Sequence, residues 1–199
     1  MVNSDLLYRL DDKPFGKTWD EWTAEWWKWL LSIPKEYNPG YDTTSERCLY
    51  GNDPNVVFLV GTFGGAAVRN YIIPARKAVL FPIIAFTTSY AEEPVLKTDL
   101  DLISRAKSDM DDIVKKEVTI NGKQLQNVNK YRIRSPIFNM TYPENNVFEA
   151  AVGPTRGISE GYWVFLRPLA SGKHKIFAAG SCSSGKTTVE VTWHLTVKE

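Results

Sequence analysis

The spacing of apolar positions along the chain predicts two helices. Thr18 and Glu21 have the spacing of a capping box, in which a hydroxyl and a carboxylate three residues apart satisfy the first helical turn. That helix is expected over about residues 18–33, because Pro34 disfavours a helical residue before it. A second, amphipathic helix is predicted over about residues 98–116, where apolar side chains recur at steps of three and four. These apolar positions are Leu100, Ile103, Met110, Ile113 and Val114.

The remaining apolar segments are typical of β-strands. Runs at residues 56–60 and 79–86 are bounded by Gly or Pro and are rich in β-branched and aromatic residues. Residues 188–197 alternate strictly between apolar and polar side chains, which predicts a strand with one buried face. No regular alternation of strands with helices occurs, so a parallel α/β sheet is disfavoured.

A hairpin is predicted at Asn121-Gly122, because this dipeptide between alternating segments is a strong turn signal. Residues 131–138 are expected to continue the same meander. Together these patterns predict a mainly β protein, an antiparallel β-sandwich or jelly-roll-like fold. It would be a single domain over residues 1–199, with an N-terminal Trp-rich helix and one further amphipathic helix.

Composition and charge exclude several classes of partner. The chain is 43% hydrophobic and 24% charged, with a net charge of +1 and no block of one sign, so no nucleic-acid partner is expected. No stretch approaches the roughly 18 apolar residues that a membrane span needs. The N-terminal residues lack the apolar run of a secretory signal, which favours a cytoplasmic location, or an extracellular one if a leader has been removed. Cys48 and Cys182 match no metal or redox spacing, and no bridge between them is expected in a cytoplasmic chain.

One segment matches the phosphate-loop expression GxxxxGK[ST]. Residues 180–187 fit it, with Lys186 at the lysine position, and a predicted strand precedes them. A helix should follow, with its N-terminus facing the phosphates, but the alternating strand at 188–197 follows instead. A Ser/Gly-rich hairpin loop is therefore expected, and Lys186 is predicted not to bind phosphate.

Two further motifs lack the structural context that their chemistry requires. Residues 157–161 fit GxSxG around Ser159, and Glu190 and His194 follow in the order of a hydrolase triad. A strand, not a helix, is predicted directly after residues 157–161. Glu190 and His194 are four positions apart on a strand, which is roughly 13 Å, so a loop serine is expected. The second motif consists of the glycines at residues 61–65, which are expected to form a tight turn between strands.

No cofactor and no metal site is predicted. The two histidines, His174 and His194, have no second histidine or cysteine at ligand spacing. The acidic cluster Asp109, Asp111 and Asp112 lacks the glycine of a calcium loop, so a solvated helix face is expected. A catalytic carboxylate pair could be drawn from several glutamates, and only geometry could select it. These are Glu92, Glu93, Glu144, Glu149 and Glu160.

The first helix carries an unusual density of tryptophan. Five of the seven tryptophans lie within eleven residues, and such a helix requires burial on most sides. The stripe of Trp22, Trp26 and Trp29 is expected to pack on the core. Trp27 and Leu31 point away from that stripe, and self-association through this helix would cover them. An aromatic platform for a carbohydrate or another small molecule is the alternative.

The chain resembles an uncharacterised family of soluble bacterial and archaeal proteins with a Trp-rich N-terminal helix. The stretches that carry the resemblance are GKTWDEWTAEWWKWLLSIP (residues 16–34), DTTSERC (42–48), FLVGTFGG (58–65), IPARKAVLFPI (73–83), LRPLASGKHKI (166–176) and VTWHLTV (191–197). The resemblance implies one coherent domain and carries over no catalytic residue.

The sequence therefore favours a non-catalytic binding or structural β-sandwich module over an enzyme, with its ligand open. The alternative is a hydrolase, including one directed at glycans, whose active site does not follow a known pattern. Candidate ligand-binding residues are Trp27, His174 and His194. A deep pocket with converging carboxylates would favour the enzyme, and a shallow aromatic surface would favour the binding module.

Overall fold

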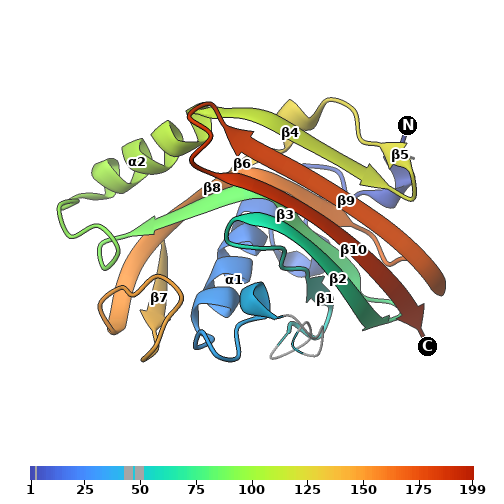
Figure 1. Ribbon diagram of the computed structural model, residues 1–199, viewed down its shortest axis with the longest axis horizontal. Helices are drawn as coiled ribbons and strands as arrows, with labels where there is room; N and C mark the ends of the chain where they lie inside the picture. Colours follow the sequence, from blue (N-terminus) through green and yellow to red (C-terminus); the bar gives the residue numbers. More distant parts are fainter. Residues whose placement is uncertain (3, 43–46, 48–51) are drawn as a thin grey trace.

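The computed structural model describes residues 1–2, 4–42, 47 and 52–199. The strands are β1 (Val56–Phe58), β2 (Gly65–Pro74), β3 (Ala78–Ser89), β4 (Ile113–Ile120), β5 (Lys123–Gln124), β6 (Arg132–Arg134), β7 (Phe138–Tyr142), β8 (Gly153–Leu166), β9 (Gly172–Cys182) and β10 (Thr188–Lys198). The α-helices are α1 (Trp19–Leu31) and α2 (Asp99–Asp111). The protein is mainly β, as predicted, and Figure 1 shows the arrangement. No helix among the described residues is long and apolar enough to cross a membrane.

The strands form two mixed sheets. Sheet 1 has the order β1-β3-β8-β6, with β7 also paired to β8, and sheet 2 has the order β2-β10-β9-β4-β5. Most pairs are antiparallel, but β1 runs parallel to β3 and β2 runs parallel to β10. The chain crosses from β1 in sheet 1 to β2 in sheet 2 and returns to β3, and such crossovers produce parallel neighbours. The sheets are therefore mixed instead of purely antiparallel, and the jelly-roll detail stays a prediction.

Helix α1 packs on one face of sheet 1, and sheet 2 and α2 cover the other. The predicted capping box is confirmed, since the Thr18 N–H donates to Glu21 Oε2 at 2.7 Å. Along β8, the ring of Trp163 contacts Trp26 of α1 with centroids 5.3 Å apart. Ile158, on the opposite face of the strand, packs with the apolar side of α2. Residues Gly157 to Leu166 of β8 are consequently buried on both faces.

The tryptophan helix is covered within one chain. Trp27 is 5% exposed and Leu31 is 0% exposed, so the prediction that a second copy covers them is wrong. The core role predicted for Trp22 and Trp26 is confirmed, because both are buried in the main cluster. The sequence pattern located the apolar stripe, but it did not show that Trp27 and Leu31 would be buried within the same chain.

The second helix is shorter than predicted. It ends at Asp111, and residues 113–116, expected as helix, belong to β4. Ile113 is buried by its place in sheet 2, whereas Leu100 and Val114 are 69% and 64% exposed and do not belong to the apolar face. Ile113 and Val114 follow Met110 at the steps of three and four that a helix would have, but this spacing is a coincidence. Both residues are β-branched and begin a strand that pairs with β9.

The predicted hairpin is confirmed, but the meander after it is not. Asn121 and Gly122 connect β4 to β5 with φ of 51° and 74°, the left-handed values that this tight turn requires. Residues 131–138 do not continue the meander, because β6 leaves sheet 2 and pairs with β8 in sheet 1. A 3₁₀ turn at Val128–Tyr131 redirects the chain between the two sheets.

Candidate functional site

A cavity of about 200 Å³ opens in the core where β1 ends. Strand β1 pairs with β3 only from Ala78 to Leu80. Beyond that point, no described strand pairs with this edge of β3. All six residues from 82 to 87 line the cavity. Because strand side chains alternate between faces, six consecutive lining residues indicate that the cavity runs along the edge of the strand. Pro82, which has no N–H to donate, suits such an unpaired edge.

Three tryptophans wall the cavity. Trp26 and Trp27 come from α1, and Trp193 comes from β10. The Trp26 Nε1–H donates to the Leu59 carbonyl at 3.2 Å, and the Trp193 Nε1–H donates to the Val60 carbonyl at 3.0 Å. The Trp27 Nε1–H is buried without a hydrogen-bond partner among the described residues. The cavity therefore has an aromatic lining, and one tryptophan of that lining keeps an unused donor.

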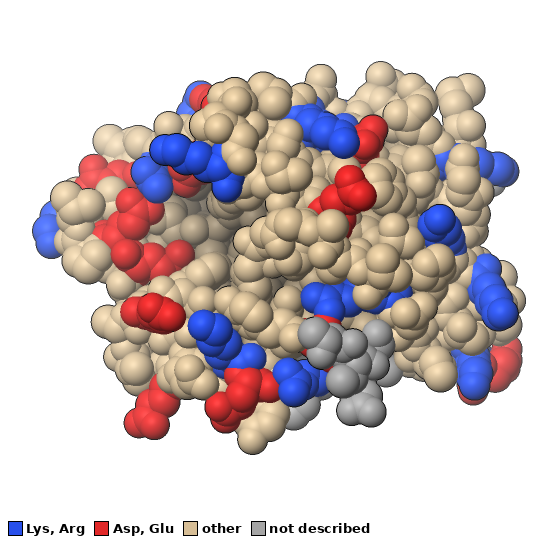
Figure 2. Space-filling model, viewed as in Figure 1, with Lys and Arg blue, Asp and Glu red and all other residues tan. Residues whose placement is uncertain are grey.

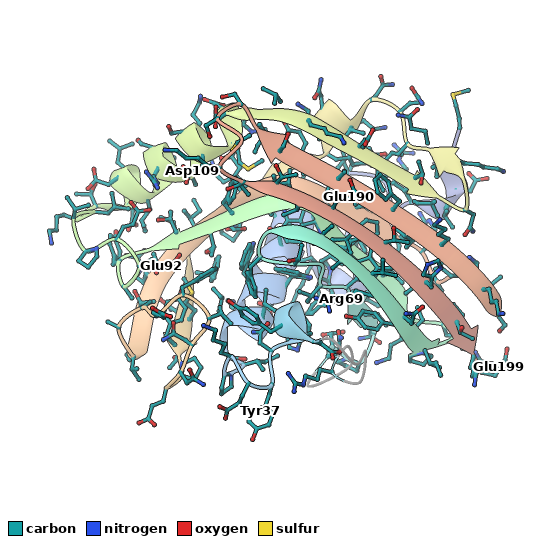
Figure 3. The ribbon with its side chains drawn as sticks, viewed as in Figure 1. Tyr37, Arg69, Glu92, Asp109, Glu190 and Glu199 are labelled. Carbon is teal, nitrogen blue, oxygen red and sulfur yellow. The ribbon has the colours of Figure 1, made fainter. Side chains whose placement is uncertain are left out.

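A larger surface cleft, here called the outer cleft, adjoins the cavity. Figure 2 shows a hollowed region on the left of this face with acidic side chains around it, and Figure 3 labels Glu92 and Asp109 there. Among the described residues that line the outer cleft, five are acidic and two are basic, which leaves three negative charges uncompensated when all are ionised. These residues are Glu92, Glu93, Asp109, Asp112 and Glu149, with Arg105 and Lys186.

Glu92 lies at the boundary between the cavity and the outer cleft, and it lines both. It follows β3, where the Ser89 hydroxyl and the Tyr142 hydroxyl of β7 donate to its Oε1 at 2.7 Å and 2.5 Å. Burial raises the pKa of the Glu92 carboxyl to about 7, against the opposing effect of these two hydrogen bonds. Burial and the nearby Glu92 charge raise the pKa of Tyr142 as well. Glu92 is thus a positioned carboxyl that changes charge near neutral pH.

The basic residue on α2 is held by carboxylates. The Arg105 Nε lies 3.1 Å from Glu93 Oε1 and 3.2 Å from Asp109 Oδ2. Burial raises the pKa of Asp109, and the charge of Arg105 opposes that shift. The expected solvated acidic helix face is found only in part, because Asp109 and Asp112 are half-buried and line the outer cleft. Only Asp111 is exposed, where it binds Arg132 at 2.7 Å.

Cys182 closes one side of the outer cleft at the end of β9. Its Sγ accepts a hydrogen bond from the Thr187 N–H at 3.1 Å, and a hydrogen bond with the Ser184 hydroxyl lowers the pKa of the thiol. Cys48 lies outside the described residues, so the prediction that no bridge joins the two cysteines stays a prediction.

The three candidate ligand-binding residues are not brought together. Trp27 lines the cavity, whereas both histidines lie at the far end of sheet 2, where they border one shallow depression. His174 is opposite Leu195 and His194 is opposite Lys175, so strand alternation puts the two imidazoles on opposite faces of the sheet. His174 is already engaged by Asn121 at 3.0 Å and by the Ala170 carbonyl. The described residues contain no group of three or more side chains suited to a metal ion.

The phosphate-loop match is a hairpin, as predicted. Residues 183–187 connect β9 to β10, and the antiparallel pairing of these strands continues directly on both sides of the loop. The helix that a phosphate loop requires is therefore replaced by a strand. Lys186 is exposed at the rim of the outer cleft.

The GxSxG match has a packing role. Ser159 lies in β8 and is 0% exposed, so the expectation of a loop serine is wrong. Glu190 and His194 are exposed on sheet 2, and no triad forms. A Cβ at Gly161 would lie 2.3 Å from the Ala85 Cβ, and one at Gly157 would lie 2.7 Å from the Thr88 carbonyl. The two glycines therefore allow β3 to approach β8 closely.

Structure selects among the glutamates that sequence could not rank. Glu92, Glu93 and Glu149 line the outer cleft. Glu160 is buried in β8 and bound by Arg132 at 2.5 Å, which makes it part of the packing against α2. Sequence reasoning did not single out Glu92, although an acidic pair directly after a long apolar strand with a mid-strand proline was a usable signal of an edge next to a polar site.

Comparisons with known proteins give only distant likenesses. No family model matches the sequence, and no curated protein matches it. The cysteine protease inhibitor EhICP2 from Entamoeba histolytica is 13% identical, with 72% of this chain and 96% of that chain covered at a TM-score of 0.29. PbICP-C, solved in complex with falcipain-2, is 8% identical, with 72% and 99% covered at 0.30, and Amebosin is 7% identical, with 73% and 100% covered at 0.21. TM-scores of 0.30 and below do not indicate a common fold, so these likenesses carry no argument about the function of this chain.

Proposed function

We propose that this protein is a non-catalytic binding module for a small ligand whose apolar body occupies the cavity at the edge of β3. The observation that carries this proposal is the cavity itself, about 200 Å³ in volume and walled by Trp26, Trp27 and Trp193. Ligand sites in proteins are typically apolar concavities with a few polar groups that fix orientation. The polar groups here belong to the outer cleft, which shares five lining residues with the cavity.

The volume of the cavity sets the size of the ligand. An engineered cavity of about 150 Å³ with an apolar lining binds benzene. About 200 Å³ therefore accommodates a six-membered aromatic ring with a short substituent. Protein interiors leave few voids larger than a water molecule, so a void of this size inside an otherwise filled core requires an explanation, and a ligand supplies one.

Two sets of unused polar groups suit a ligand that carries a hydrogen-bonding atom. The buried Trp27 Nε1–H has no acceptor among the described residues, and a buried donor without a partner is rare in native proteins. The edge of β3 at residues 82–87 presents backbone groups along the cavity. These groups support an apolar ligand with a polar substituent over a pure hydrocarbon.

The test uses 2-phenylethanol as a probe, with binding followed by calorimetry and by tryptophan fluorescence. We expect saturable binding of one probe molecule per chain, with a fluorescence change from the tryptophans of the cavity. Val189→Phe should lower the affinity by about tenfold or more, because Val189 lines the cavity from β10 and a larger ring would fill it.

The matched control makes the same substitution on the other face of sheet 2. Val68 of β2 is 64% exposed and does not line the cavity, so Val68→Phe should leave the affinity within about twofold of the unchanged protein. Absence of saturable binding, or equal loss of binding in both variants, would contradict the proposed function.

A second candidate function, hydrolysis of a glycan, is favoured by one observation. The pKa of about 7 at Glu92 is suited to a general acid, and other carboxylates line the same cleft. The direct assay measures hydrolysis of aryl glycosides by the protein. Turnover that is lost in Glu92→Gln would identify an enzyme. Binding of aryl glycosides without turnover would support the binding function only.

A further inference from the structure

A ligand that extends from the cavity into the outer cleft passes Glu92, which lines both. The cavity and the outer cleft share Phe86, Thr87, Glu92, Phe148 and Thr187, and Glu92 is the one ionisable member of that set. A ligand whose ring lies against the tryptophans therefore places its polar substituent beside a carboxyl group.

The carboxyl group of Glu92 is held in position. The hydroxyls of Ser89 and Tyr142 both donate to Oε1, and the Glu92 N–H donates back to the Ser89 Oγ at 3.2 Å. Within the described part of the chain, no hydrogen bond reaches Oε2. A fixed carboxylate with one oxygen left over is suited to a donor that comes from a ligand.

The charges around Glu92 are unfavourable to an anionic ligand. On α2, Arg105 is engaged by Glu93 and Asp109, so its charge is already neutralised. Asp112 accepts a hydrogen bond from the Ser183 hydroxyl at the hairpin that also carries Lys186. The five acidic and two basic side chains of the outer cleft together give a negative potential, and a cleft with low-dielectric walls strengthens such a potential.

We infer that the ligand is an amphipathic cation, with an aromatic or short alkyl body in the cavity and an ammonium group that binds Glu92. The inference rests on the proposed function and adds the chemical class of the ligand. An ammonium donor and a carboxylate acceptor form a charge-assisted hydrogen bond, which is roughly twice as strong as a neutral one. The cation also relieves the cost of holding the Glu92 charge in a buried position.

Three probes that share a phenylethyl body and differ in their polar group test the inference: 2-phenylethylamine, 2-phenylethanol and 3-phenylpropionate. Calorimetry at about pH 8 keeps Glu92 ionised, because its pKa is about 7, and keeps the amine protonated. We expect the amine to bind about tenfold more tightly than the alcohol or better, and the propionate to bind most weakly. Added salt should weaken the amine more than the alcohol.

Two variants assign the preference to Glu92. Glu92→Gln should bring amine and alcohol within about twofold of each other, and retained alcohol binding would show that the variant is folded. Glu144→Gln is the matched control, because Glu144 is exposed and lines neither the cavity nor the outer cleft. It should keep most of the amine preference, since exposed charges are screened.

Each remaining outcome counts against a defined statement. Equal binding of amine and alcohol would overturn this inference and leave the proposed function intact. Tightest binding of the propionate would also overturn it and would direct attention to Lys186. An amine preference that survives Glu92→Gln would overturn the assignment to Glu92. Binding of none of the three probes would overturn the proposed function, and this inference with it.

Discussion

The contact between α1 and sheet 1 has one part that includes β1 and one part that lies beyond the end of β1. At one end, here called the filled half, Trp22 rests on a row formed by Phe58, Leu80 and Phe165 of β1, β3 and β8. At the other end, the hollow half, Trp26 rests on Trp163 of β8, which pairs with Pro82 of β3, and β1 has already ended. In the hollow half, the cavity occupies the position that β1 has in the filled half.

The difference shows that the cavity results from topology and not from poor packing. Both halves have large aromatic side chains from the same helix. In the hollow half, the carbonyls of Leu59 and Val60, which could have continued β1, accept indole N–H groups instead. The chain then leaves for sheet 2. Two tryptophans thus bind the carbonyls that follow β1 and wall the space beyond its end.

The largest expected effect separates the two halves by stability. Trp22→Ala should lower the free energy of unfolding by about 3 to 5 kcal/mol, because Trp22 is 2% exposed, packs on three rings and donates to the Pro14 carbonyl. Trp27→Ala should cost about 2 kcal/mol, since the side of Trp27 that faces the cavity has few contacts to lose.

Urea unfolding of the two variants measures this difference. The comparison is informative because both residues are tryptophans of one helix and both are buried. An equal cost for the two substitutions would contradict the distinction between a filled and a hollow half.

Local signals predicted the elements that local chemistry determines. The capping box at Thr18, the Asn121-Gly122 turn and the alternation of β10 are each specified within a few residues, and all three are confirmed. The end of α2 was wrong by several residues, because Ile113 and Val114 fit a helical spacing while their pairing with β9 comes from elsewhere in the chain.

The candidate site could not be read from the sequence, because it depends on contacts between distant residues. Residues 56–60 form one apolar run, and nothing within it shows that pairing stops at Phe58. The acceptors in that run are taken by Trp26 and Trp193, which are 33 and 133 residues away from them. The role of Glu92 likewise depends on Tyr142, 50 residues later.

The second prediction concerns pH and the mouth of the hollow half. The pKa of Glu92 is raised to about 7 in the folded protein, above the value of about 4.3 for an unfolded chain. The folded state therefore holds this proton more tightly, and the contribution to stability is present below the unfolded pKa and is lost as pH rises through about 7. Glu92→Gln should match the unchanged protein near pH 4 and exceed its stability by at most about 4 kcal/mol near pH 8.

Denaturant unfolding of both proteins across this pH range gives the difference directly. The unchanged protein also contains acids whose pKa is lowered, such as Asp111, so only the difference between the two proteins isolates Glu92. A difference that does not grow between pH 5 and pH 7 would show that Glu92 is not desolvated.

The third prediction tests whether the hollow half is loose throughout. Gly180 of β9 faces Ile84, a residue of the cavity wall, and a Cβ at Gly180 would lie 2.7 Å from the Ile84 Cβ. Gly180→Ala should therefore cost about 1 to 2 kcal/mol by overpacking. Gly185→Ala in the neighbouring loop is not a matched control, because its φ of 69° adds backbone strain. Ser181→Ala, one residue further along β9 and half-buried, is the better comparison. A tolerated Gly180→Ala would mean that the two sheets separate easily around the cavity.

The smallest expected effect tests whether the ligand site belongs to the hollow half. His194 is exposed on the outer face of sheet 2 and borders a shallow depression together with His174. It does not line the cavity, so His194→Gln should change the free energy of unfolding by less than about 0.5 kcal/mol and the affinity for 2-phenylethanol by less than about twofold. Calorimetry of this variant beside Val189→Phe provides the comparison. Weaker probe binding in His194→Gln, with Val189→Phe unaffected, would move the ligand site from the cavity to the depression. The void beyond the end of β1 would then have no binding role.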